Sequence, residues 1–313
     1  GMLLPFVEPA FLAVGVIAVI NIVLVLKYPM WGLLLYLIVF LYRPGEVYPS
    51  IAAVRPELML GILVVAAIFV SKKLKTGTFS VPGDTVSISL FAFLLVLAAT
   101  VFTSYWRDAT VDTCVTFAKT LVFYYMIVAV IDNRKKFVAF VAVYCVMIGK
   151  VAYDSLKLYL EGTYIHTMGI DRLQGATSFG GDPNSLANTM AVSIPLLIAA
   201  AMYFRNRMAR YSLVALAVGT TYLIAITGSR GGLLSFFAVL AAGFIYARHK
   251  VLILIATVVI VAGGWYILPE QYKDRYKTMT EIEDIDETSS GRWEIWKSGL
   301  HMIVSRPILG VGA

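Results

Sequence analysis

Long runs of apolar residues, separated by short polar connections, recur along most of this chain. A helix needs about 20 apolar residues to cross a hydrocarbon layer of roughly 30 Å, and about ten of the runs cross it or nearly cross it. The sequence therefore predicts an all-α fold, a polytopic transmembrane bundle with spans near residues 7–26, 29–42, 57–71, 86–103, 113–131, 137–153, 184–204, 212–227, 231–246 and 251–268.

A helix of another kind is predicted over residues 289–304, capped by Ser289 or Ser290 and ending ahead of Pro307. Its large apolar residues recur in steps of three and four and so share one side. We expect this amphipathic helix to lie in the membrane interface, with the following residues toward the lipid: Trp293, Trp296, Leu300 and Ile303.

The polar connections divide the chain into two predicted regions. Residues 1–153 hold about six spans joined by short links. Residues 154–313 hold a polar loop at 154–183, about four spans, and the start of a large loop at 269–313. Most of the unusual polar motifs fall in the second region, where we expect the chemistry.

Composition agrees with a membrane protein, because 59% of the 313 residues are hydrophobic and 14% are charged. The net charge of +7 does not indicate nucleic acid, since the basic residues concentrate in alternate connections between spans. The positive-inside rule makes those connections cytoplasmic and loops 154–183 and 269–313 outward-facing. The cytoplasmic set is Lys27, Lys72, Lys73, Lys75, Arg134, Lys135, Lys136, Arg205, Arg207, Arg210, Arg248 and Lys250.

Metal and cofactor chemistry finds no support in the sequence. Cys114 and Cys145 both fall in apolar spans, and the three histidines are far apart. No metal-ligand spacing and no glycine-rich nucleotide loop is present. We therefore expect neither a metal nor a cofactor.

The motif Gly228-Ser229-Arg230-Gly231-Gly232 joins two predicted spans on the outward face with almost no loop. Gly231 and Gly232 allow a ligand to approach closely, and the first N–H groups of the following helix are expected to be unpaired. Arg230 with this helix start predicts an anion site. The alternative is an interfacial arginine that anchors a hairpin.

A second arginine, Arg292, lies in Ser290-Gly291-Arg292-Trp293 at the start of the interfacial helix. It is expected near the level of the lipid headgroups. There its guanidinium would face either a lipid-linked diphosphate or an ordinary lipid phosphate.

A helix start is predicted at Asp182-Pro183, with Asp182 as cap and Pro183 in the first helical position. Asn184 and Asn188 then share one face. They either line a polar cavity that binds sugar or join this helix to a neighbour, and the residue pattern by itself favours the second role.

Taken in order, three motifs resemble those of the O-antigen ligase and polymerase superfamily, and within it most nearly the O-glycosylation ligases. They are Gly-Asp-Pro-Asn-Ser at 181–185, Gly-Ser-Arg-Gly-Gly at 228–232, and Gly-Arg-Trp-Glu-Ile-Trp continuing to Arg306-Pro307-Ile308-Leu309-Gly310-Val311-Gly312. The resemblance implies a metal-independent GT-C-like glycosyltransferase of the bacterial inner membrane, active on the periplasmic face. It would transfer a glycan from undecaprenyl diphosphate to a hydroxyl of lipid A core, a protein or another repeat unit.

The resemblance also implies roles for particular residues. Arg230 and Arg292 match the positions that hold the donor diphosphate. The candidate pocket around them consists of Gly231, Gly232, Asp182, Asn184, Asn188 and Arg172.

The family's outer loop continues past the Gly-Val-Gly segment to a histidine that acts as general base, whereas this sequence stops at Ala313. None of His166, His249 or His301 matches that position, and His166, although outward-facing, is not expected to replace the missing base. We expect an incomplete chain that binds donor but lacks its base.

Two other classes of function stay open. A flippase or transporter for lipid-linked oligosaccharide also needs a basic outward cavity, and Lys119 within a predicted span would suit it. A non-catalytic scaffold of a glycan assembly complex is the third. The concentration of motifs on one face favours the enzyme.

Overall fold

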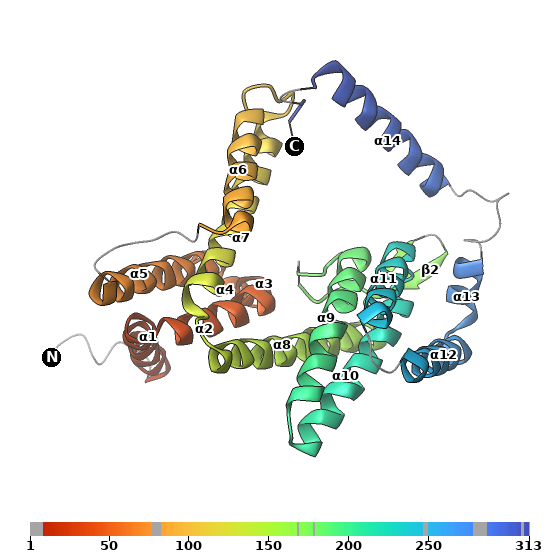
Figure 1. Cartoon of the computed structure of the whole chain (residues 1–313), viewed down its shortest axis with the longest axis horizontal. Helices are drawn as coiled ribbons and strands as arrows, with labels where there is room; N and C mark the ends of the chain where they lie inside the picture. Colours follow the sequence, from red (N-terminus) through yellow and green to blue (C-terminus); the bar gives the residue numbers. More distant parts are fainter. Residues whose placement is uncertain are drawn as a thin grey trace. The chain divides into compact units, whose positions relative to one another are not determined.

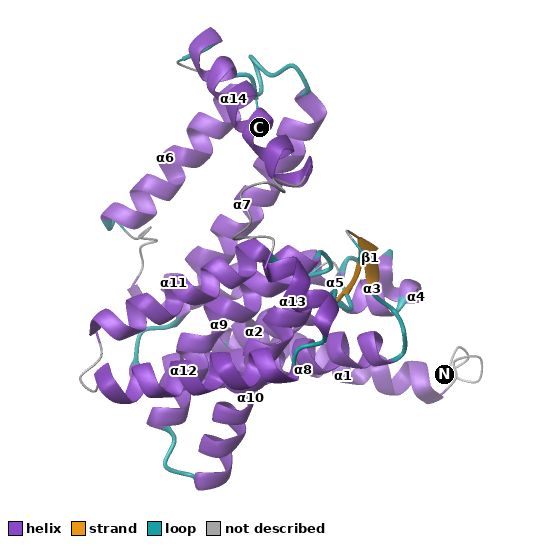
Figure 2. Ribbon diagram, turned by 90° about the vertical axis from the view of Figure 1, so that its right-hand side faces the viewer, coloured by secondary structure: helices purple, strands orange, loops and turns teal. Residues whose placement is uncertain are grey.

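The computed structural model of this protein is almost entirely helical (Figures 1 and 2). It describes residues 9–76, 83–167, 169–177, 179–246, 250–277, 287–307 and 310–312. Contacts group the chain into two compact units, and each unit is assembled from separate stretches of sequence. Unit 1 consists of Gly1–Tyr36, Leu58–Lys136 and Ile285–Ala313, and unit 2 of Leu37–Glu57 and Phe137–Asp284. The division expected near residue 153 stays a prediction.

Each of the ten apolar runs forms a helix. The helices are α1 (Pro9–Lys27), α2 (Pro29–Tyr42), α5 (Pro56–Thr76), α6 (Thr85–Thr100), α7 (Arg107–Val130), α8 (Arg134–Leu160), α9 (Pro183–Tyr203), α10 (Arg207–Ile226), α11 (Arg230–Tyr246) and α12 (Lys250–Ile267). Within the described residues, four of them, α7 to α10, are long and apolar enough to cross a membrane. In the other six, the described apolar stretch is only 10–17 residues long, so the count of ten spans stays a prediction.

The remaining elements are short or polar. Two one-turn helices, α3 (Pro44–Val47) and α4 (Pro49–Ala52), follow α2, and α13 (Glu270–Lys277) follows α12. Helix α14 (Glu287–Ser305) covers the predicted interfacial helix and ends ahead of Pro307. An antiparallel hairpin of β1 (Ile165–Thr167) and β2 (Ile170–Arg172), which the sequence did not predict, lies in the loop before α9.

Helix α9 packs against both α10 and α11 in unit 2 (Figure 1). Its fully buried face combines bulky Leu186 and Met190 with small Ala187. The small residue is needed because α11 comes very close: a Cβ atom on Gly232 would lie 2.2 Å from the Cβ of Ala187. Small residues at such a crossing are a common means of packing helices in membranes.

In unit 1, α6 and α7 lie side by side and are joined by polar contacts near the start of α6. Asp84 caps α6 by accepting from the Ser87 N–H at 3.0 Å. The Tyr125 hydroxyl donates to the Ser87 carbonyl at 3.0 Å. The cap fixes where α6 begins, and the bond from Tyr125 holds that start against α7.

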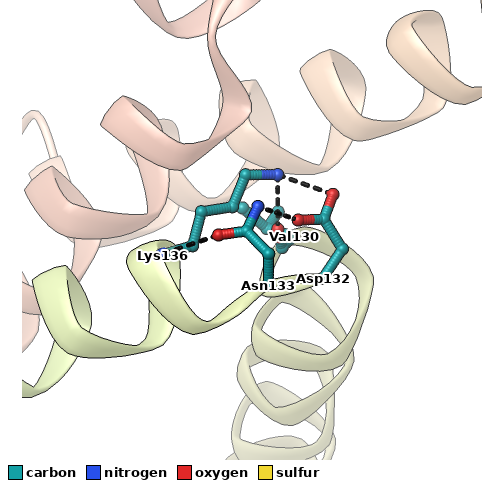
Figure 3. Close-up of polar contacts among 4 residues, drawn as sticks. All are labelled: Val130, Asp132, Asn133 and Lys136. Carbon is teal, nitrogen blue, oxygen red and sulfur yellow. Dashed lines mark hydrogen bonds and ion pairs between the residues drawn. The ribbon is translucent and has the colours of Figure 1, made fainter.

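The connection from α7 to α8 is a compact polar cap at a predicted cytoplasmic turn (Figure 3). Lys136 Nζ donates to the Val130 carbonyl at 3.0 Å and to Asp132 Oδ2 at 2.7 Å. Asn133 Oδ1 accepts from the Lys136 N–H at 3.0 Å. The hydrogen bond from Lys136 lowers the pKa of Asp132, so this aspartate is ionised at neutral pH.

We predict that adjacent glycines of α11 will respond oppositely to alanine. Gly232→Ala should destabilise the protein by about 1–3 kcal/mol because its methyl group overlaps Ala187. Gly231→Ala should be neutral or slightly stabilising, since a Cβ at that position would meet open space out to 4 Å. Thermal unfolding of the purified variants in detergent measures both, and equal melting temperatures would contradict the close approach of α9 and α11.

Candidate functional site

The turn between α10 and α11 is as tight as the sequence predicted. Helix α10 ends at Ile226 and α11 begins at Arg230. Gly228 makes this possible with a φ of +60°, a conformation that residues with a Cβ rarely adopt. A Cβ there would also lie 2.4 Å from Ile170 Cδ1, so only glycine fits against the hairpin.

The carbonyl groups at the end of α10 and in the turn are bound by groups from elements outside the helix. The Leu173 N–H donates to the Ile226 carbonyl at 3.1 Å, and the Tyr276 hydroxyl donates to the Ala225 carbonyl at 2.9 Å. Two arginines supply the rest: Arg172 Nε donates to the Thr227 carbonyl and Arg275 Nε to the Gly228 carbonyl, each at 2.8 Å. Together, β2, the residue after it and α13 hold the turn.

Asn184, in the first turn of α9, is the centre of a second set of bonds. Its Oδ1 accepts from Arg172 Nη2 at 3.1 Å and from the Ser229 hydroxyl at 2.7 Å. Its Nδ2 donates to Asp182 Oδ1 at 3.3 Å. Asn184 therefore joins the start of α9, the hairpin and the turn before Arg230.

The start of α11 differs from the expectation in one respect. Ser229 Oγ accepts from the Gly232 N–H at 3.0 Å and so caps the helix. The Gly232 N–H was expected to be available to an anion, and that expectation is wrong because a serine stands at the cap position. Arg230 is the first residue of α11, where it is half-buried, and Gly231 beside it is exposed.

The predictions for α9 are confirmed in detail. Asp182 Oδ2 accepts from the Ser185 N–H at 2.9 Å, and Pro183 occupies the first helical position. Asn188 Oδ1 accepts from the Ser235 hydroxyl of α11 at 2.9 Å. Asn184 and Asn188 thus join their helix to its neighbour, which is the role that the residue pattern favoured.

Arg172, which the sequence placed in the candidate pocket, is only 7% exposed and directs its guanidinium to Thr227 and Asn184. Arg275 was missed. It lies in the polar helix α13, beside Tyr272 and Tyr276, whose burial packs α13 onto the core. The signal in the sequence was the spacing of these tyrosines: two large aromatic residues four positions apart in a charged segment indicate that one side of the helix packs inward.

The two arginines also affect Tyr276. Burial raises the pKa of its hydroxyl to about 12, while the positive charges of Arg275 and Arg172 act in the opposite direction. The hydroxyl is therefore protonated at neutral pH and donates its hydrogen bond to Ala225.

The other predicted residues belong to different elements or fall outside the described residues. Arg292 belongs to α14 in unit 1, and its side chain is outside the described residues, so its pairing with Arg230 stays a prediction. His249 is also outside them. His301 is exposed on α14. His166, on β1, is exposed and its Nδ1 lies 2.7 Å from Asp171 Oδ1.

A comparison with known families identifies residues 215–313 as matching the O-antigen ligase family. This range includes both Arg230 and Arg292, and it confirms the resemblance to the O-antigen ligase superfamily. No curated protein and no solved structure matches the chain significantly. The family match and the apolar helices together support a multi-pass membrane protein with a role in glycan processing.

We predict that the Tyr276 contact weakens at high pH. The folded-state pKa lies above the ordinary value of 10.0, so the stability from protonated Tyr276 is complete below pH 10 and is lost as pH rises through about 12. At pH 8, Tyr276→Phe should lower stability by about 1 kcal/mol through loss of the hydrogen bond to Ala225. The gap in melting temperature between wild type and variant should then narrow between pH 10 and 12.

Tyr266→Phe is the matched control, because Tyr266 in α12 is 87% exposed. Its melting temperature should follow that of the wild type at every pH. A gap for Tyr276→Phe that is constant from pH 8 to 12 would contradict a raised pKa.

Proposed function

We propose that this protein is a membrane glycosyltransferase that transfers a glycan from undecaprenyl diphosphate to an acceptor hydroxyl on the periplasmic face of the bacterial inner membrane. The observation that carries the proposal is the position of Arg230 at the start of α11. It follows a turn held by Arg172, Asn184 and Arg275, and it lies inside the region that matches the O-antigen ligase family.

The electrostatics of the turn suit an anionic group. The N-terminus of a helix carries a partial positive charge, and α11 begins at Arg230 itself. The guanidinium groups of Arg172 and Arg275 are both bonded to carbonyls within the three residues before it. Their charges add to the positive potential around Arg230, so a diphosphate near this turn would be stabilised.

In the proposed reaction, the acceptor hydroxyl oxygen bonds to the anomeric carbon of the glycan as the bond from that carbon to the phosphate oxygen breaks. Undecaprenyl diphosphate leaves with the electron pair, and the acceptor proton passes to a base. Arg230 and Arg292 would bind the diphosphate and stabilise the charge that develops on the leaving oxygen. No metal is required for this step, since guanidinium groups supply the positive charge.

The other residues of the candidate pocket support Arg230. Asp182 and Asn184 hold the start of α9 against the turn, and Asn188 ties α9 to α11 through Ser235. Arg172 bonds both the turn, at the Thr227 carbonyl, and the start of α9, at Asn184 Oδ1. We propose that these four are positioning residues and that exposed Gly231 leaves room for the donor beside Arg230.

We predict that Arg230→Lys and Arg292→Lys each reduce glycan transfer by about tenfold or more, because lysine provides a point charge in place of a planar, bidentate donor. The assay measures transfer from a lipid-linked glycan by the purified full-length protein in detergent. Arg210→Lys is the control. Arg210 lies near the start of α10, at the opposite end of that helix from the turn before Arg230, and it donates to the Ala201 carbonyl of α9. Its activity should be unchanged.

The same assay separates the enzyme from a transporter. Detergent solution has no second compartment, so a flippase or a scaffold would yield no transferred product whatever its arginines. Full activity of both arginine variants would refute the diphosphate role while leaving the transferase interpretation intact.

A further inference from the structure

The residues after α14 are attached to the connection between α6 and α7. We call residues 306–312 the anchor segment, of which the structure describes 306–307 and 310–312. At its start, Arg306 Nη1 donates to the Thr103 carbonyl at 2.6 Å. The guanidinium carbon of Arg306 also lies 4.7 Å from the centre of the Tyr105 ring. Arg306 thus makes a hydrogen bond and a cation–π contact to one connection.

The end of the anchor segment is attached to the same connection. The Tyr105 N–H donates to the Val311 carbonyl at 3.1 Å. Gly312 packs against the hydroxyls of Ser104 and Thr110, which lie 2.7 Å from each other. A Cβ on Gly312 would lie 2.3 Å from Ser104 Oγ and 2.7 Å from Thr110 Oγ1. Because φ of Gly312 is also +105°, this docking requires glycine.

The two attachment points are consistent with the topology inferred from charge. The positive-inside pattern puts the α6–α7 connection on the outward face, together with the loop that begins at residue 269. That inference used the charges of the connections and the order of the predicted spans, so it is independent of the contacts above. Between the two points, the Gly310 N–H donates to the Arg306 carbonyl at 3.0 Å.

We infer that the anchor segment is a docking element that fixes the end of α14 to the outward ends of α6 and α7, with Arg306 as a positioning residue. Arg292 lies in α14, and Arg306 directly follows the end of that helix, fourteen residues and a rise of about 20 Å further on. A helix held at one end carries the residues at its other end to a restricted region. The proposed function assigns Arg292 to the donor diphosphate, and on that basis the anchor segment limits the positions that Arg292 can occupy relative to α6 and α7.

Arginine suits this position better than lysine. Its planar group stacks on Tyr105 while one of its N–H groups bonds Thr103, and the compact ammonium of lysine cannot do both with the same geometry. Glycine at 312 and arginine at 306 are therefore both explained by a single docking surface, residues 103–110.

Disulfide formation in membranes tests the docking. The background for the test is full-length protein with Cys114→Ala and Cys145→Ala. In this background the pair Tyr105→Cys and Val311→Cys should oxidise rapidly. The two residues are joined by a backbone hydrogen bond, and this keeps their Cα atoms within the range of about 4.4–6.8 Å that a disulfide bridges. Loss of labelling by a maleimide-linked polymer reports the disulfide. The control pair is Phe91→Cys with Val311→Cys, since Phe91 lies nine residues before the end of α6, about 13 Å away along the helix.

Two glycines provide a matched comparison in the same disulfide assay. Gly312→Ala should slow oxidation of the 105–311 pair severalfold, because the added methyl group collides with Ser104 and Thr110. Gly310→Ala should have a much smaller effect: Gly310 also has a positive φ, of +64°, but nothing lies within 4 Å of a Cβ placed there. Oxidation no faster than that of the control pair, or equal effects of the two alanines, would overturn the docking.

The positioning role is tested separately by donor kinetics. Arg306→Ala should raise the KM for the lipid-linked donor severalfold, and Arg306→Lys should restore it only in part. Rapid oxidation of the 105–311 pair with an unchanged donor KM in Arg306→Ala would overturn the positioning of Arg292. The oxidation assay requires no transfer activity, so a failure of the proposed function would be seen in the transfer assay alone.

Discussion

The candidate site depends on how the carbonyl groups at the end of α10 are satisfied. A helix leaves its last carbonyls without partners inside the helix, and in a largely buried region water does not replace them. Here a backbone N–H after β2, a tyrosine of α13 and two arginines provide the partners. Because the partners come from two distant segments, residues 172–173 and residues 275–276, the turn before Arg230 forms only when the hairpin, α10 and α13 of unit 2 have come together.

The same bonds explain why a region with so few charges retains two arginines beside a turn. A buried guanidinium is costly unless its N–H groups are bonded, and here carbonyl and amide oxygens bond them. Arg172 and Arg275 therefore contribute charge and structure together. Removing either would leave a carbonyl of the turn without its partner, so the two contributions would be lost at once.

The sequence predicted the structural features that are set by residues close together in the chain. The apolar runs predicted the ten helices, Asp182 and Pro183 predicted the start of α9, and the glycines predicted the tight turn before Arg230. Contacts between distant segments were beyond such signals. Arg275 reaches Gly228 across 47 positions and Arg306 reaches Thr103 across 203, and neither periodicity nor capping rules relate such pairs. The Ser229 cap was within reach, since serine three residues before Gly232 is an ordinary cap position.

The cap at Ser229 affects the direction of the Arg230 side chain as well as the stability of α11. Its hydroxyl has one proton, which goes to Asn184, and it accepts the Gly232 N–H in return. These two interactions together specify Arg230 as the first residue of α11. Successive residues of a helix point about 100° apart around its axis. The cap therefore fixes the direction of Arg230: if the sequence were shifted by one residue along the helix, the guanidinium of Arg230 would point more than a quarter of a circle away, with its charge unchanged.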